Sequence, residues 1–108
     1  MKAITPVHLG DNGASVSNLH KALLFLIWTE SIEGTDRQSL KEQLAPEMHP
    51  ETFGQATFRI VKIFQQNLDS HVGIDFPKDL KAPLPNGDVD EITAKALNWL
   101  LRKRGALR

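Results

Sequence analysis

Apolar residues recur at steps of three and four along three stretches of the chain, which is the spacing of one buried face of an α-helix. The first stretch predicts a helix from about residue 15 to about residue 30. The second predicts a long helix that begins just after Gly54, and the third predicts a helix that begins at Asp90, whose carboxylate can accept hydrogen bonds from the first-turn amides. The residues of the three stripes are Val16, Leu19, Leu23, Leu26 and Ile27; Phe53, Thr57, Ile60, Val61, Phe64 and Leu68; and Ile92, Ala96, Leu97, Trp99, Leu100 and Leu101. Alternating strand patterns are absent, so the sequence predicts an all-α fold in which three helices share one core.

One extra short helix is predicted in the connection between the first two helices. Thr35 stands three residues before Gln38, which is the spacing of a capping box. This helix carries Leu40 and Leu44, and Pro46 is expected to end it. Two interpretations of the inserted segment stay open: an ornament or contact surface outside the core, or a fourth wall of the core built by the two leucines.

The connection between the second and third long helices, residues 69–88, holds too many glycines and prolines for a helix and is too long for a tight turn. Its apolar residues are expected to pack on the helices; they are Val72, Ile74, Phe76, Leu80 and Leu84. The basic tail after residue 101 is expected to end the last helix at Gly105.

The composition is typical of a single soluble domain spanning residues 1–108, with 13 Lys and Arg, 13 Asp and Glu, and no cysteine. The lack of cysteine excludes disulfides, a thiol nucleophile and a Cys-type zinc site. A formal net charge of +0 argues against nucleic acid or a membrane surface as partner, and no apolar run is long enough for membrane insertion. The N-terminus lacks the apolar segment of a signal peptide. The chain as written is therefore expected in the cytoplasm, or at the cell envelope or outside the cell if it is exported by another route or belongs to a larger chain.

Four short motifs stand near the predicted helix starts or on the second long helix. They are LGDNGASV at residues 9–16, FGQAT at 53–57, VKIFQ at 61–65 and NGDVDEIT at 86–93. In order and spacing these motifs resemble the peptidoglycan-binding-like domain family, and the resemblance covers most of the chain. It implies a three-helix bundle that serves as a bacterial cell-wall recognition module. The chain departs from the family at His20, where the family has Gln, and in its two long connections, which are similar to those of variants in large bacterial toxin-like or secreted proteins.

Glycan recognition needs planar polar side chains that share hydrogen bonds with hydroxyl and acetamide groups, beside an apolar wall for the sugar faces. Six residues are predicted to line such a groove where the loops meet: Asp11, Asn12, Gln65, Gln66, Asn86 and Asp88. For each of them the alternative is ordinary solvated polarity. For Gln65 a further interpretation is that its amide ties down a neighbouring loop.

The sequence offers no catalytic, metal or cofactor site, so the chain is expected not to be an enzyme. It contains neither a Gly-x-Ser-x-Gly elbow nor a phosphate-binding glycine loop. The four histidines, His8, His20, His49 and His71, lack the spacing of metal ligands, and His20 is expected to be hydrogen-bonded at the edge of the bundle.

The two tryptophans receive different interpretations. Trp99 lies on a core stripe, whereas Trp28 either covers the inserted helix or is an exposed aromatic for a sugar or a protein partner. The leading hypothesis is a non-catalytic module that binds peptidoglycan or a related glycan polymer. The alternative is a protein-protein interaction or spacer module of the same fold, with the long connections as its contact surface and a partner protein or the parent chain bound there.

Overall fold

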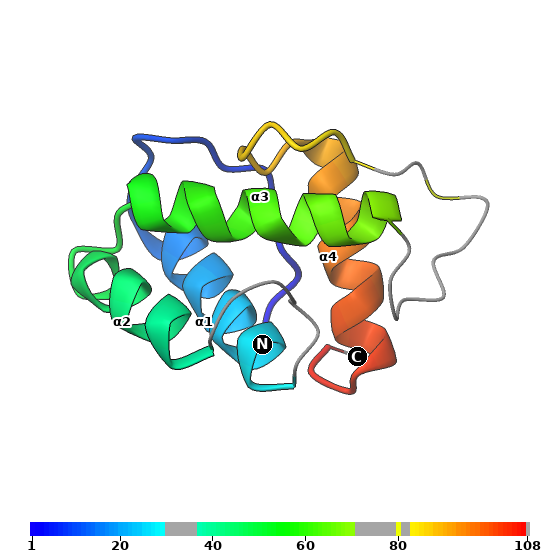
Figure 1. The fold of residues 1–108 in the computed structure, drawn as a ribbon, viewed down its shortest axis with the longest axis horizontal. Coiled ribbons are helices and arrows are strands. Elements are labelled where there is room, and N and C mark those ends of the chain that lie inside the picture. Colours follow the sequence, from blue (N-terminus) through cyan, green and yellow to red (C-terminus); the bar gives the residue numbers. More distant parts are fainter. Residues whose placement is uncertain (30–36, 71–79, 81–82, 108) are drawn as a thin grey trace.

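The computed structural model describes residues 1–29, 37–70, 80 and 83–107, with residues 68–70 described by their backbone alone (Figure 1). The helices in these ranges are α1 (Ala14–Trp28), α2 (Arg37–Met48), α3 (Gln55–Ser70) and α4 (Glu91–Lys103). Strand pairing in the same ranges is limited to two isolated bridges, Val7 with Val89 and Asn12 with Thr52. The predicted all-α fold class is therefore confirmed.

One apolar core joins the four helices. Helices α1, α2 and α3 pack against one another, and Figure 1 shows α3 running across the molecule with α1 and α2 toward its N-terminal end and α4 toward its C-terminal end. The helical residues that are at most 1% exposed in this core are Val16, Leu19, Ala22, Leu23, Leu26 and Ile27; Leu40 and Leu44; Ile60, Val61 and Phe64; and Ala96, Leu97, Leu100 and Leu101. The predicted stripes thus face the core, except that Ile92 and Trp99 are only partly buried and that the side chain of Leu68 lies outside the described residues.

Helix α2 extends further than the sequence predicts. It continues through Pro46 to Met48, so the expectation that Pro46 ends it is wrong. Pro46 lies in the last turn, where its missing N–H removes a single backbone hydrogen bond. Leu40 and Leu44 are buried in the shared core, which agrees with the fourth-wall interpretation of the inserted segment. Thr35 and its predicted capping box lie outside the described residues.

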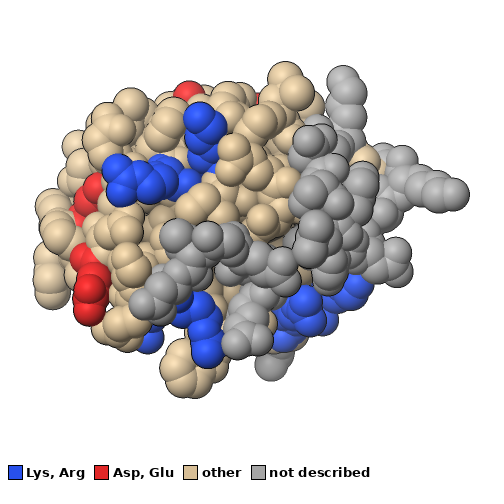
Figure 2. All heavy atoms as spheres, viewed as in Figure 1, with Lys and Arg blue, Asp and Glu red and all other residues tan. Residues whose placement is uncertain are grey.

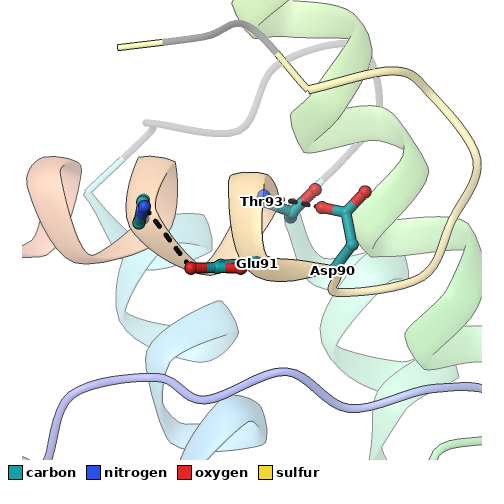
Figure 3. A network of polar contacts seen from close by, with 4 residues as sticks. Asp90, Glu91 and Thr93 are labelled. Carbon is teal, nitrogen blue, oxygen red and sulfur yellow. Dashed lines mark hydrogen bonds and ion pairs between the residues drawn. The ribbon is translucent and has the colours of Figure 1, made fainter.

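Helix α4 begins as predicted. Asp90 Oδ1 accepts a hydrogen bond from the Thr93 backbone N–H at 2.8 Å and so caps the helix with its own side chain (Figure 3). Glu91 and Lys95 form a 3.5 Å ion pair one turn apart, but both side chains are largely exposed, so the pair contributes little. Gly105, at a φ of 84°, follows the end of the helix as predicted.

The long connection before α4 is described only in part. The predicted packing of Val72, Ile74 and Phe76 lies outside the described residues. Leu80 is partly buried, whereas Leu84 is 75% exposed, so the packing expected of Leu84 is wrong. The buried position at this point of the chain is taken by the adjacent Pro83.

The N-terminal segment runs alongside α4 and ties the first residues to the last helix. Ile4 N–H donates to Asn98 Oδ1 at 2.7 Å, and Asn98 Nδ2 donates back to the Ile4 carbonyl at 3.0 Å. Ile4 itself is buried in the core. Over the described ranges, none of the helices combines the length and apolar character needed to cross a membrane.

Candidate functional site

Two loops that are far apart in the sequence lie side by side. The first loop (residues 8–13) leads into α1, and the last loop (residues 83–90) leads into α4; together they are called the loop pair below. Val7 and Val89 exchange two backbone hydrogen bonds of 2.9 and 3.0 Å, and the Leu9 N–H donates to Asp88 Oδ1 at 3.0 Å. The loops therefore meet, as the predicted groove requires.

Gln65 holds the last loop in place from beneath. Its side chain is 0% exposed, and its Nε2 donates to Thr93 Oγ1 at 2.9 Å, to the Asp88 carbonyl at 3.0 Å and to Asn86 Oδ1 at 3.2 Å. Its Oε1 accepts the Gly87 N–H at 2.8 Å. Because the protein uses both ends of this buried amide, Gln65 is a loop tether, and its placement among the ligand-contacting residues is corrected to that interpretation.

Gly87 is required for this tethered geometry. Its φ is +83°, and a Cβ at this position would lie 2.4 Å from Cε2 of Phe58. Side chains rarely adopt such a φ, and the partly buried ring of Phe58 would have to move to make room for the Cβ. Glycine at this position thus lets the last loop sit directly on α3.

The other five predicted residues remain at the surface. Asp88 is half-buried, and the exposed ones are Asp11, Asn12, Gln66 and Asn86. The two carboxylates among them also shape the loop pair. Asp11 Oδ2 accepts the His8 N–H at 2.8 Å, and Asp88 Oδ1 accepts the Leu9 N–H. Gln66 follows Gln65 on α3 and is rotated from it by about 100° around the helix axis, which explains why one amide is buried and the next is exposed.

The loop pair also carries exposed apolar side chains. Leu9 on the first loop is 45% exposed and Leu84 on the last loop is 75% exposed. Both therefore offer apolar surface beside the polar groups of the same loops. This is the combination of apolar wall and planar polar groups that glycan recognition needs.

A second polar cluster, which the sequence did not predict, caps the N-terminus of α3. Glu47 Oε1 accepts the N–H groups of Gly54 and Thr57 at 3.0 and 2.9 Å and the Thr57 hydroxyl at 2.6 Å, while its Oε2 accepts the Ala56 N–H at 2.8 Å. A Cβ on Gly54 would lie 2.6 Å from that Oε2, so glycine there makes room for the carboxylate. Burial alone would raise the pKa of Glu47, but these hydrogen bonds outweigh it and hold the pKa below its ordinary value.

His20 completes this cluster from α1. Its Nε2 lies 2.9 Å from Thr57 Oγ1, and because the Thr57 hydroxyl donates to Glu47, we assign the proton of this contact to Nε2. The ring is buried, and Nδ1 has no hydrogen-bond partner among the described residues. Burial lowers the pKa of His20 below its ordinary value. The negative charges of Glu47 and Glu51 and the polar backbone of Thr52 would each raise the pKa, but burial outweighs them. His20 is therefore hydrogen-bonded, as expected, but it is a buried residue, so its expected position at the edge of the bundle is wrong.

Trp28 lies at the other end of α1, away from the loop that leads into that helix. Its side chain is 69% exposed, and Lys41 Nζ stands 5.5 Å from the ring centroid. Arg37 Nη1 donates to the Trp28 carbonyl at 3.0 Å. Together with Ile27 and Gln38 these residues line a hollow of about 500 Å³. Of the two interpretations of Trp28, the structure agrees with the exposed aromatic.

Two further observations concern clusters of metal-ligating side chains and the distribution of basic side chains in the described part of the chain. No group of three or more His, Asp or Glu side chains there is arranged to hold a metal ion. On the face drawn in Figure 2, the described Lys and Arg side chains lie at separate places and do not merge into one basic surface. The loop pair is the candidate site because hydrogen bonds hold its two loops together.

Comparisons with known proteins provide no relative from which a function could be transferred. The scan against family models, the search of curated proteins and the search of solved structures each gave no match to this chain. The resemblance to peptidoglycan-binding-like domains therefore stays a prediction carried by the four sequence motifs.

Proposed function

We propose that the protein is a non-catalytic recognition module that binds peptidoglycan or a related glycan polymer through the loop pair. The observation that carries this proposal is the contact between the two loops, held by the Val7–Val89 bridge and the bond from Leu9 to Asp88. This contact gathers exposed amides and carboxylates from two distant parts of the chain beside Leu9 and Leu84.

The proposed architecture follows from the resemblance of the four sequence motifs to those of peptidoglycan-binding-like domains. In it, α1, α3 and α4 form the three-helix peptidoglycan-binding-like bundle, and α2 is the extra helix of the insertion. The motifs that carry the resemblance lie at the first loop, at the start of α3, around Gln65 and at the last loop, which are the segments that build the loop pair and its support.

Preorganisation of the last loop, and of the part of the first loop that contacts it, supports a binding role. A surface whose polar groups are already in place loses less conformational entropy when it captures a ligand. The buried Gln65 amide and the Asp11 and Asp88 carboxylates fix the backbone of the two loops. The Asn86 amide also belongs to this internal network, because its Oδ1 accepts the Asp88 N–H and Gln65 Nε2. The Asn12 side chain is left at the surface, where it can meet sugar hydroxyl or acetamide groups.

Co-sedimentation of the purified protein with isolated wall sacculi tests the proposal, with cellulose and chitin as polymer controls. We expect binding to sacculi, and a roughly two- to tenfold weaker affinity for Asn12→Ala, which is the effect of one lost hydrogen bond. Gln66→Ala tests whether the binding surface extends from the loop pair to the exposed face of α3. Gln43→Ala is the matched control, because Gln43 lies on α2 and bonds Ser39 and Arg59. Unchanged binding of a folded Asn12→Ala and Leu84→Ala double variant would reject the loop pair as the binding surface.

One observation favours the second candidate function, protein-protein interaction. An exposed tryptophan flanked by Arg37 and Lys41 has the composition of a binding hot spot. This candidate predicts that Trp28→Ala abolishes binding to a partner protein and leaves sacculus binding intact. Loss of sacculus binding in Trp28→Ala, with full binding in the loop variants, would instead place the glycan site at the Trp28 hollow.

A further inference from the structure

We propose that Asn12 is a site of spontaneous deamidation in the folded protein, and that the fold protects the chain's second Asn-Gly pair, Asn86–Gly87, from the same reaction. Both pairs lie in the loop pair, and both asparagine side chains are exposed. Exposure alone therefore does not distinguish them. The difference lies in how each following glycine is held, and it does not depend on the proposed glycan-binding function.

The reaction needs only the chain and water. The backbone nitrogen of the glycine loses its proton and attacks Cγ of the preceding asparagine; a bond forms between these two atoms while the Cγ–Nδ2 bond breaks. The amide nitrogen takes up a proton and leaves as ammonia. Water then opens the resulting cyclic imide at one of its two carbonyls, which yields either aspartate or isoaspartate. Glycine favours the attack because it has no Cβ to hinder the approach of its nitrogen.

At Asn86–Gly87 both reacting groups are held by the interior of the protein. The attacking nitrogen belongs to the buried Gly87, whose N–H donates at 2.8 Å to Oε1 of the fully buried Gln65. The attacked side chain is fixed as well, because Asn86 Oδ1 accepts the Asp88 N–H at 3.0 Å and Gln65 Nε2 at 3.2 Å. Freeing the nitrogen therefore requires the Gln65 network to open, and that network is part of the packed junction between α3 and α4.

At Asn12–Gly13 the constraint lies at the surface. The Gly13 N–H donates at 3.0 Å to the Glu51 carbonyl, and Gly13 is only partly buried. Glu51 has a φ of 52°, a backbone conformation that residues other than glycine adopt less readily. The other bond of this bridge, from the Phe53 N–H to the Asp11 carbonyl at 2.9 Å, involves the buried Phe53. The Gly13 nitrogen is freed when only the bond between Gly13 and Glu51 opens, and both of these residues are partly buried. Surface bonds of this kind open at a much lower free energy than buried networks.

The modification would change the loop pair chemically. Replacing the Asn12 amide by a carboxylate places a new negative charge beside Asp11. In the isoaspartate product the backbone is also longer by one atom, at the position that pairs with Thr52. Both products are therefore more acidic than the unmodified protein. In the isoaspartate product the backbone that leads into α1 is also distorted.

Incubation of the intact protein at mildly alkaline pH, followed by tryptic peptide mass spectrometry, tests the inference. Trypsin separates the two sites, because Asn12 falls in the peptide of residues 3–21 and Asn86 in the peptide of residues 82–95. We expect deamidation at Asn12 to be roughly tenfold or more faster than at Asn86 in the folded protein. Fragmentation of the first peptide distinguishes Asn12 from Asn18. Equal rates at Asn12 and Asn86, or faster reaction at Asn86, would overturn the inference.

Two controls connect the result to the fold. In denaturant the two Asn-Gly pairs are expected to react at comparable rates; if Asn12 keeps the same advantage there, the fold is not its cause and the inference fails. By ion exchange, the acidic form should fail to develop in Asn12→Ser and should persist in Asn86→Ser. Amide hydrogen exchange of the unmodified protein gives an independent readout, in which Gly13 is expected to exchange faster than Gly87.

Discussion

The helices α3 and α4 are capped in different ways. The cap of α4 is local, because it comes from the adjacent residue, and the cap of α3 is a tertiary cap, because it comes from another helix. Helix α4 is capped by Asp90, the residue immediately before it. Helix α3 is capped by Glu47, which comes from the end of α2 and contacts residues seven to ten positions further along the chain. The start of α3 therefore depends on the position of a neighbouring helix, whereas the start of α4 is encoded within its own first turn.

The largest expected effect comes from removing the helix that provides the tertiary cap. Replacing residues 31–50 by a short Gly/Ser linker deletes Leu40, Leu44 and Glu47 together. Losing either buried leucine alone costs about 2–5 kcal/mol, so we expect the shortened chain to be unfolded by circular dichroism. A cooperative thermal transition close to that of the intact protein would show instead that α2 is dispensable for the core.

Removing only the capping carboxylate should give the next largest effect. Glu47→Ala leaves the first-turn donors of α3 and the Thr57 hydroxyl without their acceptor, and we expect the free energy of unfolding to fall by about 3 kcal/mol. Glu47→Gln keeps an acceptor oxygen and should cost less. Chemical denaturation measures both variants; equal stability of Glu47→Ala and the unmodified protein would contradict the tertiary cap.

The local cap should be weaker. Asp90→Ala removes the carboxylate that accepts the Thr93 N–H and that also takes part in side-chain hydrogen bonds with Thr93 and Asn86. We expect a loss of about 1 kcal/mol in the free energy of unfolding, with Asp90→Asn closer to the unmodified protein. The same denaturation series gives the comparison directly. A larger loss for Asp90→Ala than for Glu47→Ala would reverse the proposed ranking of the two helix starts.

The pH dependence of stability sharpens the comparison further, with an effect expected to be smaller than that of either cap deletion. Because the folded state lowers the pKa of His20, the unfolded chain binds more protons as the pH falls below 6.5, the ordinary value, and stability decreases there. Burial alone would raise the pKa values of Glu47 and Asp90, but hydrogen bonds to their carboxylates outweigh it and lower both values. The stability that these groups contribute is therefore present above their ordinary pKa values, 4.5 and 3.8, and is lost as the pH falls through the lowered values.

The window from pH 7 to pH 5 therefore reports on His20. Melting temperatures across this window should fall more for the unmodified protein than for His20→Gln, which keeps a donor for Thr57 and does not titrate. Parallel pH profiles for the two proteins would exclude His20 as the group responsible.

Much of the fold follows from patterns that can be read within one or two helical turns. The three apolar stripes, the Asp90 cap and the helix end at Gly105 depend on residues close together in the sequence, and the structure agrees with them. The capping role of Glu47 could not be predicted in this way, because Glu47 lies too far from the start of α3 to match a local capping motif. Its role arises only when α2 packs beside the start of α3, and no sequence signal in this chain announces that contact.

The candidate site, too, could be predicted from the sequence only in part. Glycine and polar residues at the two loops indicated where the loops were, but they did not distinguish a buried tether from a surface contact. Gln65 and Gln66 are adjacent and chemically identical, and only the helical phase of α3 relative to the core separates them. For this reason the sequence allowed the interpretation of Gln65 as a loop tether but could not distinguish it from a ligand contact.

The double hydrogen bond between Asn98 and Ile4 has a consequence for the speed of folding. It joins positions 94 residues apart, and the Val7–Val89 bridge is nearly as distant in sequence. Contacts of this span raise the contact order of a helical protein, because the entropy of closing a long loop must be overcome before the contact gains anything. We therefore expect this chain to fold more slowly than an up-and-down helical bundle of equal length, with the junction between the N-terminal segment and α4 among the last parts to form.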